Sequence, residues 1–151
     1  MIIDEKDCKS KIDALTYQDW QPLLALIPKI KNISKVWEWC GEDTNKEGVI
    51  IFPSFVPASI VSQFLEIVYT IPIIISFDWV SWDEGWKIAS DEEFDYDGID
   101  LVTKCKLITA IVRNDRFCAG ALVSAFESGL ILKILKSIEK EVNTKGTADS
   151  Y

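Results

Sequence analysis

The sequence predicts a mainly α-helical single domain with a small β-hairpin in its N-terminal third, while an α+β arrangement stays open. Three observations predict this class. The chain has 151 residues, 48% of them hydrophobic and 11% aromatic, which is enough apolar material for one buried core. Apolar residues recur at helical spacing through most of residues 101–142. Two strand-prone segments, residues 36–39 and 49–52, enclose a polar stretch.

Residues 14–142 are expected to form this domain, with a loosely ordered segment at 1–13 and a flexible tail at 143–151. About five or six helices are expected from the apolar periodicity. The N-terminal residues lack the basic start and the apolar run of a signal peptide. The longest apolar stretch, residues 67–77, is too short to span a bilayer. The sequence therefore predicts a cytoplasmic protein that does not associate with a membrane.

The first predicted helix begins at Thr16, which fits a capping arrangement together with Asp19. Pro28 is expected to end or kink this helix, because proline lacks a backbone donor and clashes with the preceding turn. The apolar face of the helix consists of Trp20, Leu23, Leu24 and Ile27.

A β-hairpin and a second helix come next. Residues 36–39 and 49–52 are expected to pair across a long polar loop. Pro57 fits the first position of the helix, which should run to about Tyr69. Residues 72–75 fit either a short buried strand or a helical turn.

A short helix capped by Asp78 is predicted to follow, and then a loop at 91–100 that contains six acids. The three C-terminal helices, roughly 100–113, 117–127 and 130–142, should form the core. Gly129 can end the second of these helices. Their apolar seams are Leu101, Cys105, Ile108 and Val112 in the first helix, Leu122 and Phe126 in the second, and Ile131, Ile134, Leu135, Ile138 and Val142 in the last.

The composition excludes several kinds of site. The chain has no histidine, which excludes histidine-based triads, histidine acid–base catalysis and histidine-containing metal sites. The cysteines at positions 8, 40, 105 and 118 lack paired spacing, which favours reduced thiols over a Cys₄ zinc site. The acids of 91–100 do not match a calcium loop, because neither register places both the glycine and the final glutamate. We therefore expect no metal and no cofactor.

The net charge of the chain indicates which classes of binding partner are favoured. The formal net charge is −8, from 24 acidic and 16 basic residues. This balance disfavours direct nucleic-acid binding, since lysine and arginine contacts to phosphate supply most of that affinity. An acidic surface is compatible with a basic protein partner or with imitation of nucleic acid. The oligomeric state is not indicated.

Both arginines of the chain lie three residues apart, at Arg113 and Arg116, and the other fourteen cationic residues are lysines. Arginine has a rigid, always charged fork that can hold a carboxylate or a phosphate with two hydrogen bonds. Its place near an apolar seam predicts an anionic partner, because an unpaired buried charge is costly. The favoured interpretation is internal pairing with the acids of 91–100, with Asp115 or with Glu127. The alternative is an external anion such as a phosphate or a partner's carboxylate.

A tryptophan stripe is the second candidate. Trp79, Trp82 and Trp86 are spaced for one helical face, and Asp78 and two further acids lie close by in sequence. An aromatic face at helical spacing favours a core role. Aromatic platforms beside carboxylates would also suit a sugar-binding cleft or glycoside hydrolysis.

Three stretches, residues 52–57, 77–85 and 107–135, resemble a family known as domain of unknown function family 6508. The hallmark of the resemblance is the pattern R-x-x-R-F-x-x-G at residues 113–120, and the similarity covers about residues 15–142. The resemblance implies a bacterial or phage source and a self-standing small domain. It brings with it no activity, cofactor or catalytic residue.

The function that these observations favour is a small acidic, non-enzymatic interaction or regulatory module with a possible protein partner. One alternative is a binder, or slow hydrolase, of a small anionic or sugar-like ligand. In that alternative Arg113 and Arg116 hold the ligand, Trp79 and Trp82 form a wall, and Asp78 lies nearby. Another alternative is an acidic inhibitor that imitates nucleic acid.

Overall fold

The computed structural model describes residues 2–32, 37–40, 43–44, 50–51, 54–57, 59–118 and 120–149, and side chains for 2–32, 59–118 and 120–144. Within these residues the chain is mainly helical, as predicted. The elements in chain order are β1 (Ile2–Asp4), α1 (Cys8–Asp13), α2 (Tyr17–Leu24), α3 (Leu26–Lys31), β2 (Trp37–Cys40), β3 (Asp43–Thr44), β4 (Ile50–Ile51), β5 (Ser54–Pro57), α4 (Ser59–Thr70), β6 (Ile74–Ser76), α5 (Asp83–Ser90), the 3₁₀ turn η1 (Tyr96–Gly98), α6 (Leu101–Asn114), α7 (Ala121–Glu127) and α8 (Leu130–Asp149).

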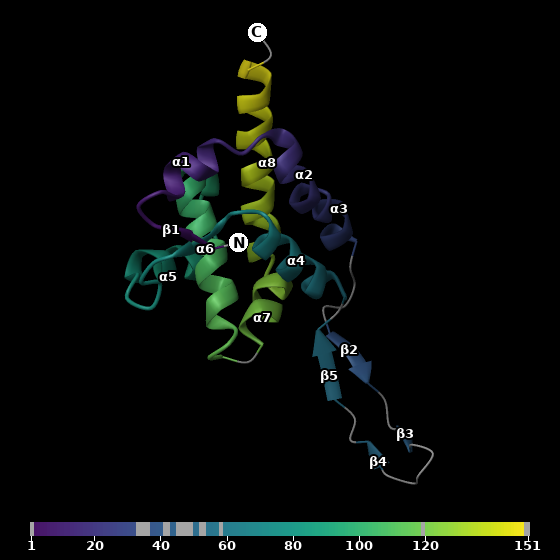
Figure 1. The fold of residues 1–151 in the computed structure, drawn as a ribbon. Coiled ribbons are helices and arrows are strands. Elements are labelled where there is room, and N and C mark those ends of the chain that lie inside the picture. The colour runs from purple at the N-terminus through teal and green to yellow at the C-terminus, as the bar shows by residue number, and fades with distance from the viewer. Residues whose placement is uncertain are drawn as a thin grey trace.

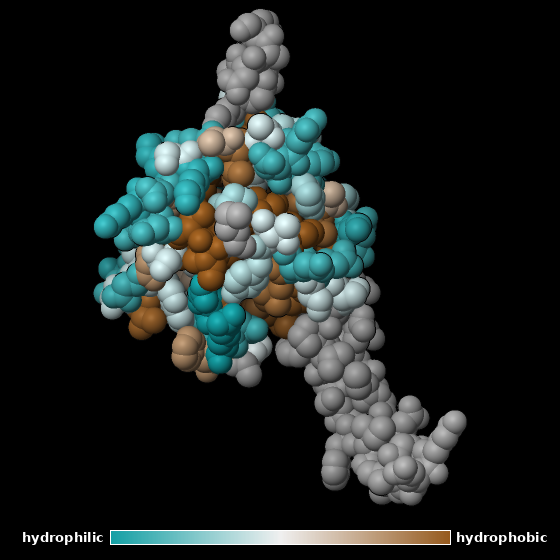
Figure 2. Space-filling model, in the orientation of Figure 1, coloured by the Kyte–Doolittle hydropathy of each residue, from teal (hydrophilic) through white to brown (hydrophobic). Residues whose placement is uncertain are grey.

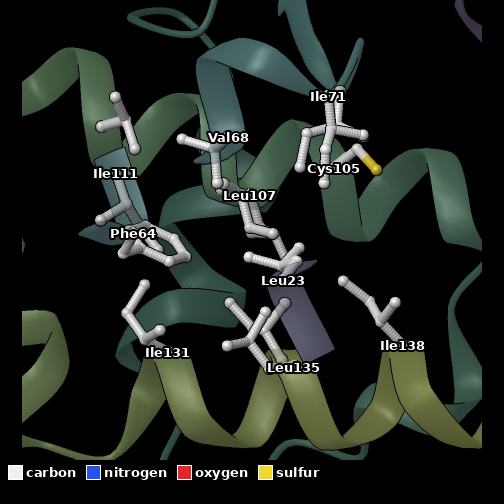
Figure 3. Close-up of a cluster of buried hydrophobic side chains, with 14 of the residues drawn as sticks. Leu23, Phe64, Val68, Ile71, Cys105, Leu107, Ile111, Ile131, Leu135 and Ile138 are labelled. Atoms are coloured by element: carbon white, nitrogen blue, oxygen red, sulfur yellow. The ribbon is translucent and has the colours of Figure 1, made fainter. Parts of the chain in front are cut away.

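Helix α8 is the axis of the fold, and it packs against α2, α3, α6 and α7 (Figure 1). Its apolar seam is buried as predicted, and so are the seams predicted for α6 and α7. Figure 3 shows part of this core: Ile131, Leu135 and Ile138 of α8 lie opposite Phe64 of α4, Leu107 of α6 and Leu23 of α2. The C-terminal helices therefore form the core together with α4 and α2.

The N-terminal helical region confirms the predicted cap and corrects the predicted end. Thr16 and Asp19 form a reciprocal capping box, in which the Asp19 N–H donates to Thr16 Oγ1 at 3.3 Å and the Thr16 N–H donates to the Asp19 carboxylate at 2.8 Å. The helix ends after Leu24, and Pro28 lies within the first turn of α3. Proline is tolerated there because the first backbone N–H groups of a helix have no partner within it.

Residues 2–13 belong to the fold, whereas a loosely ordered segment was expected there. Strand β1 pairs in parallel with β6, with Ile3 opposite Ile75. Ile3, Cys8 and Ile12 are buried in the core. Residues 74–76 are accordingly strand, which decides the ambiguity at 72–75. Thr109 of α6 ties this sheet to the helices, because its hydroxyl accepts the Ile75 N–H at 3.1 Å and donates to the Cys105 carbonyl at 2.8 Å.

The predicted hairpin is present with a different register. Strand β2 pairs with β5 in antiparallel fashion, so that Trp37 lies opposite Pro57. Pro57 therefore ends a strand, and α4 begins only at Ser59. In a two-stranded ladder proline can lie where no N–H is required. Strand β4, from the segment expected to pair with residues 36–39, pairs instead with β3. The predicted side-chain alternation at 36–39 lies outside the described side chains.

The last helix is longer than expected. A break before α8 is set by Gly129, whose φ of +83° is readily adopted only by glycine. Helix α8 then continues to Asp149, through most of the segment predicted to be a flexible tail. None of the described helices is long and apolar enough to cross a membrane.

Candidate partner-binding site

The candidate site is built around the turn that follows α6. Asn114 ends the helix, and its carbonyl accepts the N–H groups of Phe117 at 3.0 Å and Cys118 at 2.8 Å. Gly120, with φ of +86°, then reverses the chain into α7. This tight turn leaves Phe117 at its tip, where 77% of the residue's surface is exposed. A phenylalanine this exposed contributes little to the core.

Phe117 is part of a group that we call the aromatic surface, defined by Trp79, Val80, Trp86 and Phe117; Val80 and Phe117 are exposed, and Trp79 and Trp86 are half-buried. Trp79 lies at its centre, with ring centroids 5.8 Å from Phe117 and 6.2 Å from Trp86. Val80, beside it in the chain, is 66% exposed. Figure 2 shows hydrophobic residues reaching the surface on this part of the molecule, near α5 and the end of α6, beside strongly hydrophilic ones. Ring contacts thus bring residues from two separate segments together on this side of the molecule.

The predicted helix starting at Asp78 is not present, so the three tryptophans do not share one helical face. Residues 80–81 form a turn, and α5 begins at Asp83. Asp78 holds the turn through its carboxylate, which accepts the Ser81 N–H at 3.3 Å. Trp82 packs edge-on against Phe77 at 5.4 Å and lies over Gly85. Tertiary packing of Trp82 therefore overrides the helical spacing, and Trp82 and Asp78 are not part of the aromatic surface.

The arginine pair, Arg113 and Arg116, is not paired with the acids that the sequence suggested. Among the described side chains, neither guanidinium group makes a salt bridge or a hydrogen bond. Asp115 is directed elsewhere: its carboxylate accepts the Leu122 N–H at 3.0 Å and so caps α7, whose own first residues offer no side-chain cap. The predicted internal network with residues 91–100, Asp115 or Glu127 was therefore wrong.

An open cavity of about 420 Å³ lies between α4 and the end of α6. Leu65, Tyr69 and Val112 give it an apolar lining. Arg116 lines it together with two acids, Glu66 and Asp115. A phosphate entering this cavity would meet two carboxylates as well as one guanidinium group, so its charge balance disfavours a multiply charged anion.

A second cluster of charges joins α6 to α8 and η1, and here each charge has a partner. The Lys104 ammonium, almost fully buried, lies 2.6 Å from Glu141. Asp97 accepts the Ser137 hydroxyl at 2.6 Å and the Lys140 ammonium at 3.2 Å. These hydrogen bonds, that from Ser137 first, lower the pKa of Asp97. The satisfied hydrogen bonds and the burial of Lys104 indicate a structural role.

The described cysteines differ in exposure. Cys105 is fully buried, and burial raises the pKa of its thiol, so the reactive thiolate is disfavoured. Cys8 is also buried, whereas Cys118 is exposed in the turn after α6. Within the described residues, no group of three acids or cysteines is arranged to hold a metal ion.

The structure thus brings together part of the predicted site. Trp79 lies against Phe117, which is the direct chain neighbour of Arg116. Sequence reasoning missed Val80 and Phe117 as surface residues, because a single exposed apolar residue has no periodic pattern. The one available signal was that Phe117 follows an arginine directly, at the start of the predicted helix 117–127.

Residues 15–144 match the family of unknown function DUF6508, and the chain belongs to this family. No curated protein and no solved structure matches the chain. The family match covers α2 to most of α8, and it includes the aromatic surface and the arginine pair.

Proposed function

We propose that this protein is a non-enzymatic interaction module that binds a protein segment through the aromatic surface and the arginine pair. The segment would present an apolar side chain to Trp79 and Phe117, and a carboxylate to Arg113 or Arg116. The observation that carries the proposal is the exposure of Phe117 in direct contact with Trp79. Phe117 directly follows Arg116 in the chain, and the guanidinium groups of Arg113 and Arg116 have no partner in the described part of the chain.

The apolar part of the proposal rests on the cost of leaving aromatic rings in water. Each buried aromatic side chain removes on the order of 150–250 Å² from solvent, and tryptophan and arginine are enriched among residues that dominate binding energy. Trp79 packs against two other rings, with centroid distances of 5.8 Å to Phe117 and 6.2 Å to Trp86. A partner would therefore meet an ordered surface and lose little entropy by ordering it.

The charged part of the proposal rests on the contrast between the arginine pair and the whole chain. The formal net charge of −8 repels acidic proteins in general. A partner carboxylate is accepted only where guanidinium groups are free to bind it with two hydrogen bonds. This combination supports a specific segment over non-specific attraction.

The alternatives have less support. For a small anionic ligand, the cavity beside Arg116 also presents Glu66 and Asp115. For a sugar-like ligand, Trp79 and Trp82 would have to form one wall, yet Trp82 packs against Phe77. An acidic inhibitor that imitates nucleic acid would use carboxylates, and the exposed aromatic surface has no part in that role.

The test is a site-specific crosslink in cells that naturally make the protein. A photoreactive phenylalanine derivative replaces Val80, and a matched variant carries it at Tyr17 on α2, which is also exposed. We expect a crosslinked protein adduct from position 80 and none of the same mass from position 17. Adding Phe117→Ser should lower the yield of the adduct from position 80 by about five-fold. Adding Arg113→Gln together with Arg116→Gln should lower this yield by a similar factor. Each five-fold loss corresponds to about 1 kcal/mol of binding free energy.

Three outcomes would contradict the proposal. They are an absence of any adduct at position 80, an adduct that Phe117→Ser leaves unchanged, and an adduct that contains a second copy of this chain. Thermal melting of each purified variant separates lost binding from lost folding.

A further inference from the structure

A second surface lies on the other part of α5, where the helix meets the loop that follows it. This groove has a volume of about 570 Å³. Its apolar floor is formed by Ile88, Phe94 and Ile99, and its carboxylates are Glu84, Asp91 and Asp95. We call it the acidic groove. Among the described residues it shares none with the aromatic surface.

Ring packing and backbone hydrogen bonds fix several residues that line the acidic groove. Phe94 packs edge-on against Tyr96, with ring centroids 5.1 Å apart, and Tyr96 is buried. The carboxylate of Asp91 accepts the Glu93 N–H at 3.0 Å. Asp95 accepts the Asp97 N–H at the same distance. The apolar floor and two of the acids are therefore present before any partner binds.

The charges of the groove are unbalanced. Lys87 is the one cation among its lining residues, against three carboxylates. Glu84 and Lys87 make no hydrogen bond or salt bridge with any residue whose side chain is described. The acids are also not arranged for a metal, since no such group occurs among the described residues. A cation that reaches across an apolar floor fits this arrangement, as the side chain of lysine or arginine does.

We infer that the acidic groove binds a protein segment in which a lysine or arginine stands next to an apolar side chain. The apolar side chain would cover Phe94 and Ile99, and the cation would lie among Glu84, Asp91 and Asp95. A segment fits better than a small molecule, because the groove is open to solvent and small-ligand pockets enclose most of their ligand. This inference does not depend on the proposed function, because it concerns a different surface and a partner of opposite charge.

The test measures fluorescence anisotropy with a labelled peptide of ten residues that alternates lysine and leucine. One comparison peptide carries glutamate for lysine, and another carries serine for leucine. At about 150 mM salt, where long-range attraction is screened, we expect the lysine–leucine peptide to bind at least about five-fold more tightly than either.

The variants decide where the peptide binds. Glu84→Gln, Asp91→Asn and Asp95→Asn together should weaken binding by about five-fold or more, since they keep size and turn acceptors while removing charge. The matched control removes three charges from residues that do not line the groove, through Glu92→Gln, Glu93→Gln and Glu127→Gln, and should change the Kd by less than about two-fold.

Each opposite result overturns the inference. Equal weakening by both triple variants would mean attraction to net charge alone. Equal binding of the serine peptide would remove the role of the apolar floor, and no binding of the lysine–leucine peptide would remove the site. Phe117→Ser, which leaves the groove intact, should not change the affinity for this peptide.

Discussion

Helix α6 carries cations at both of its ends, and the fold treats them in opposite ways. Near the N-terminal end, Lys104 is 1% exposed and lies 2.6 Å from Glu141 of α8. At the C-terminal end, Arg113 and Arg116 have no partner among the described side chains. Asp115, which could have formed a salt bridge with either arginine, caps α7 instead.

This difference between Lys104 and the arginine pair distinguishes a charge that stabilises the fold from charges that are available to bind a partner. A lysine that is buried between helices must have a carboxylate, because an unpaired charge there costs several kcal/mol. A guanidinium group that water reaches can stay unpaired at little cost to the fold. The same contrast applies to the aromatic residues, since Trp82 packs against Phe77 and Gly85 while Phe117 is 77% exposed. Five predictions test this contrast.

The largest effect is expected from Glu141→Leu. It leaves the buried Lys104 ammonium without its partner, so we expect a loss of about 2–3 kcal/mol in the free energy of unfolding, measured by urea denaturation. The loss should stay below that of a fully buried pair, because the Glu141 side chain is 38% exposed and water can reach the site. The double variant Lys104→Met with Glu141→Leu should recover most of it. A double variant as unstable as the single one would contradict this account.

Gly85→Ala comes next and tests whether Trp82 is structural. A Cβ at this position would overlap the Trp82 ring, which must then move from its place against Phe77. Overpacking costs about 1–3 kcal/mol, and the better helix propensity of alanine offsets up to about 1 of that. We expect a net loss of about 1–2 kcal/mol. Gly98→Ala is the matched control, because its Cβ would meet nothing within 4 Å. Equal stability of the two variants would show that Trp82 adapts freely.

The sequence was sufficient where a regular pattern and burial coincide. The seams of α6 and α8 and the capping box at Thr16 follow from local spacing, and the structure confirms them. Gly129 ended α7 as predicted, because a positive φ leaves few other residues possible. In each case one short stretch of chain contains the whole cause.

The rest depends on contacts between segments that are distant in sequence. The parallel pairing of β1 with β6 joins residues about seventy positions apart, and no local pattern announces it. Lys104 pairs with Glu141 only because α8 packs against α6 at these two residues. The aromatic surface needs Trp79 and Phe117 to meet, which the helical spacing of the tryptophans obscured.

Asp100 gives the third effect, through the start of α6. Its carboxylate accepts the Thr103 N–H at 2.8 Å and the Thr103 hydroxyl. Hydrogen bonding to the Thr103 side chain, the largest cause, lowers the pKa of Asp100 below its usual 3.8. Asp100→Ala should therefore cost about 1 kcal/mol at neutral pH. Asp100→Asn should cost a few tenths, because an asparagine can still accept the backbone N–H.

The pH dependence of stability follows from the same shifts. The pKa values of Asp97 and Asp100 are lower in the folded state, so their stabilisation is complete above the unfolded pKa near 3.8 and is lost as the pH falls through the lower, folded values. Urea midpoints measured from about pH 5 to pH 2 should fall for the parent. The fall should be shallower for Asp97→Asn with Asp100→Asn. Parallel curves for the two proteins would contradict the assigned cause.

The smallest effect on stability is expected from the arginine pair, and it is the most informative about function. Arg116→Lys removes a bidentate fork, which would cost about 1–3 kcal/mol if the fork held an internal carboxylate. Because no described acid pairs with it, we expect a change within about 0.5 kcal/mol, and the same for Arg113→Lys. If Arg116 contributes to partner binding, Arg116→Lys should lower the crosslink yield at position 80 while the melting temperature stays that of the parent. A clearly lower melting temperature would instead show that Arg116, like Lys104, is a charge that the fold itself requires.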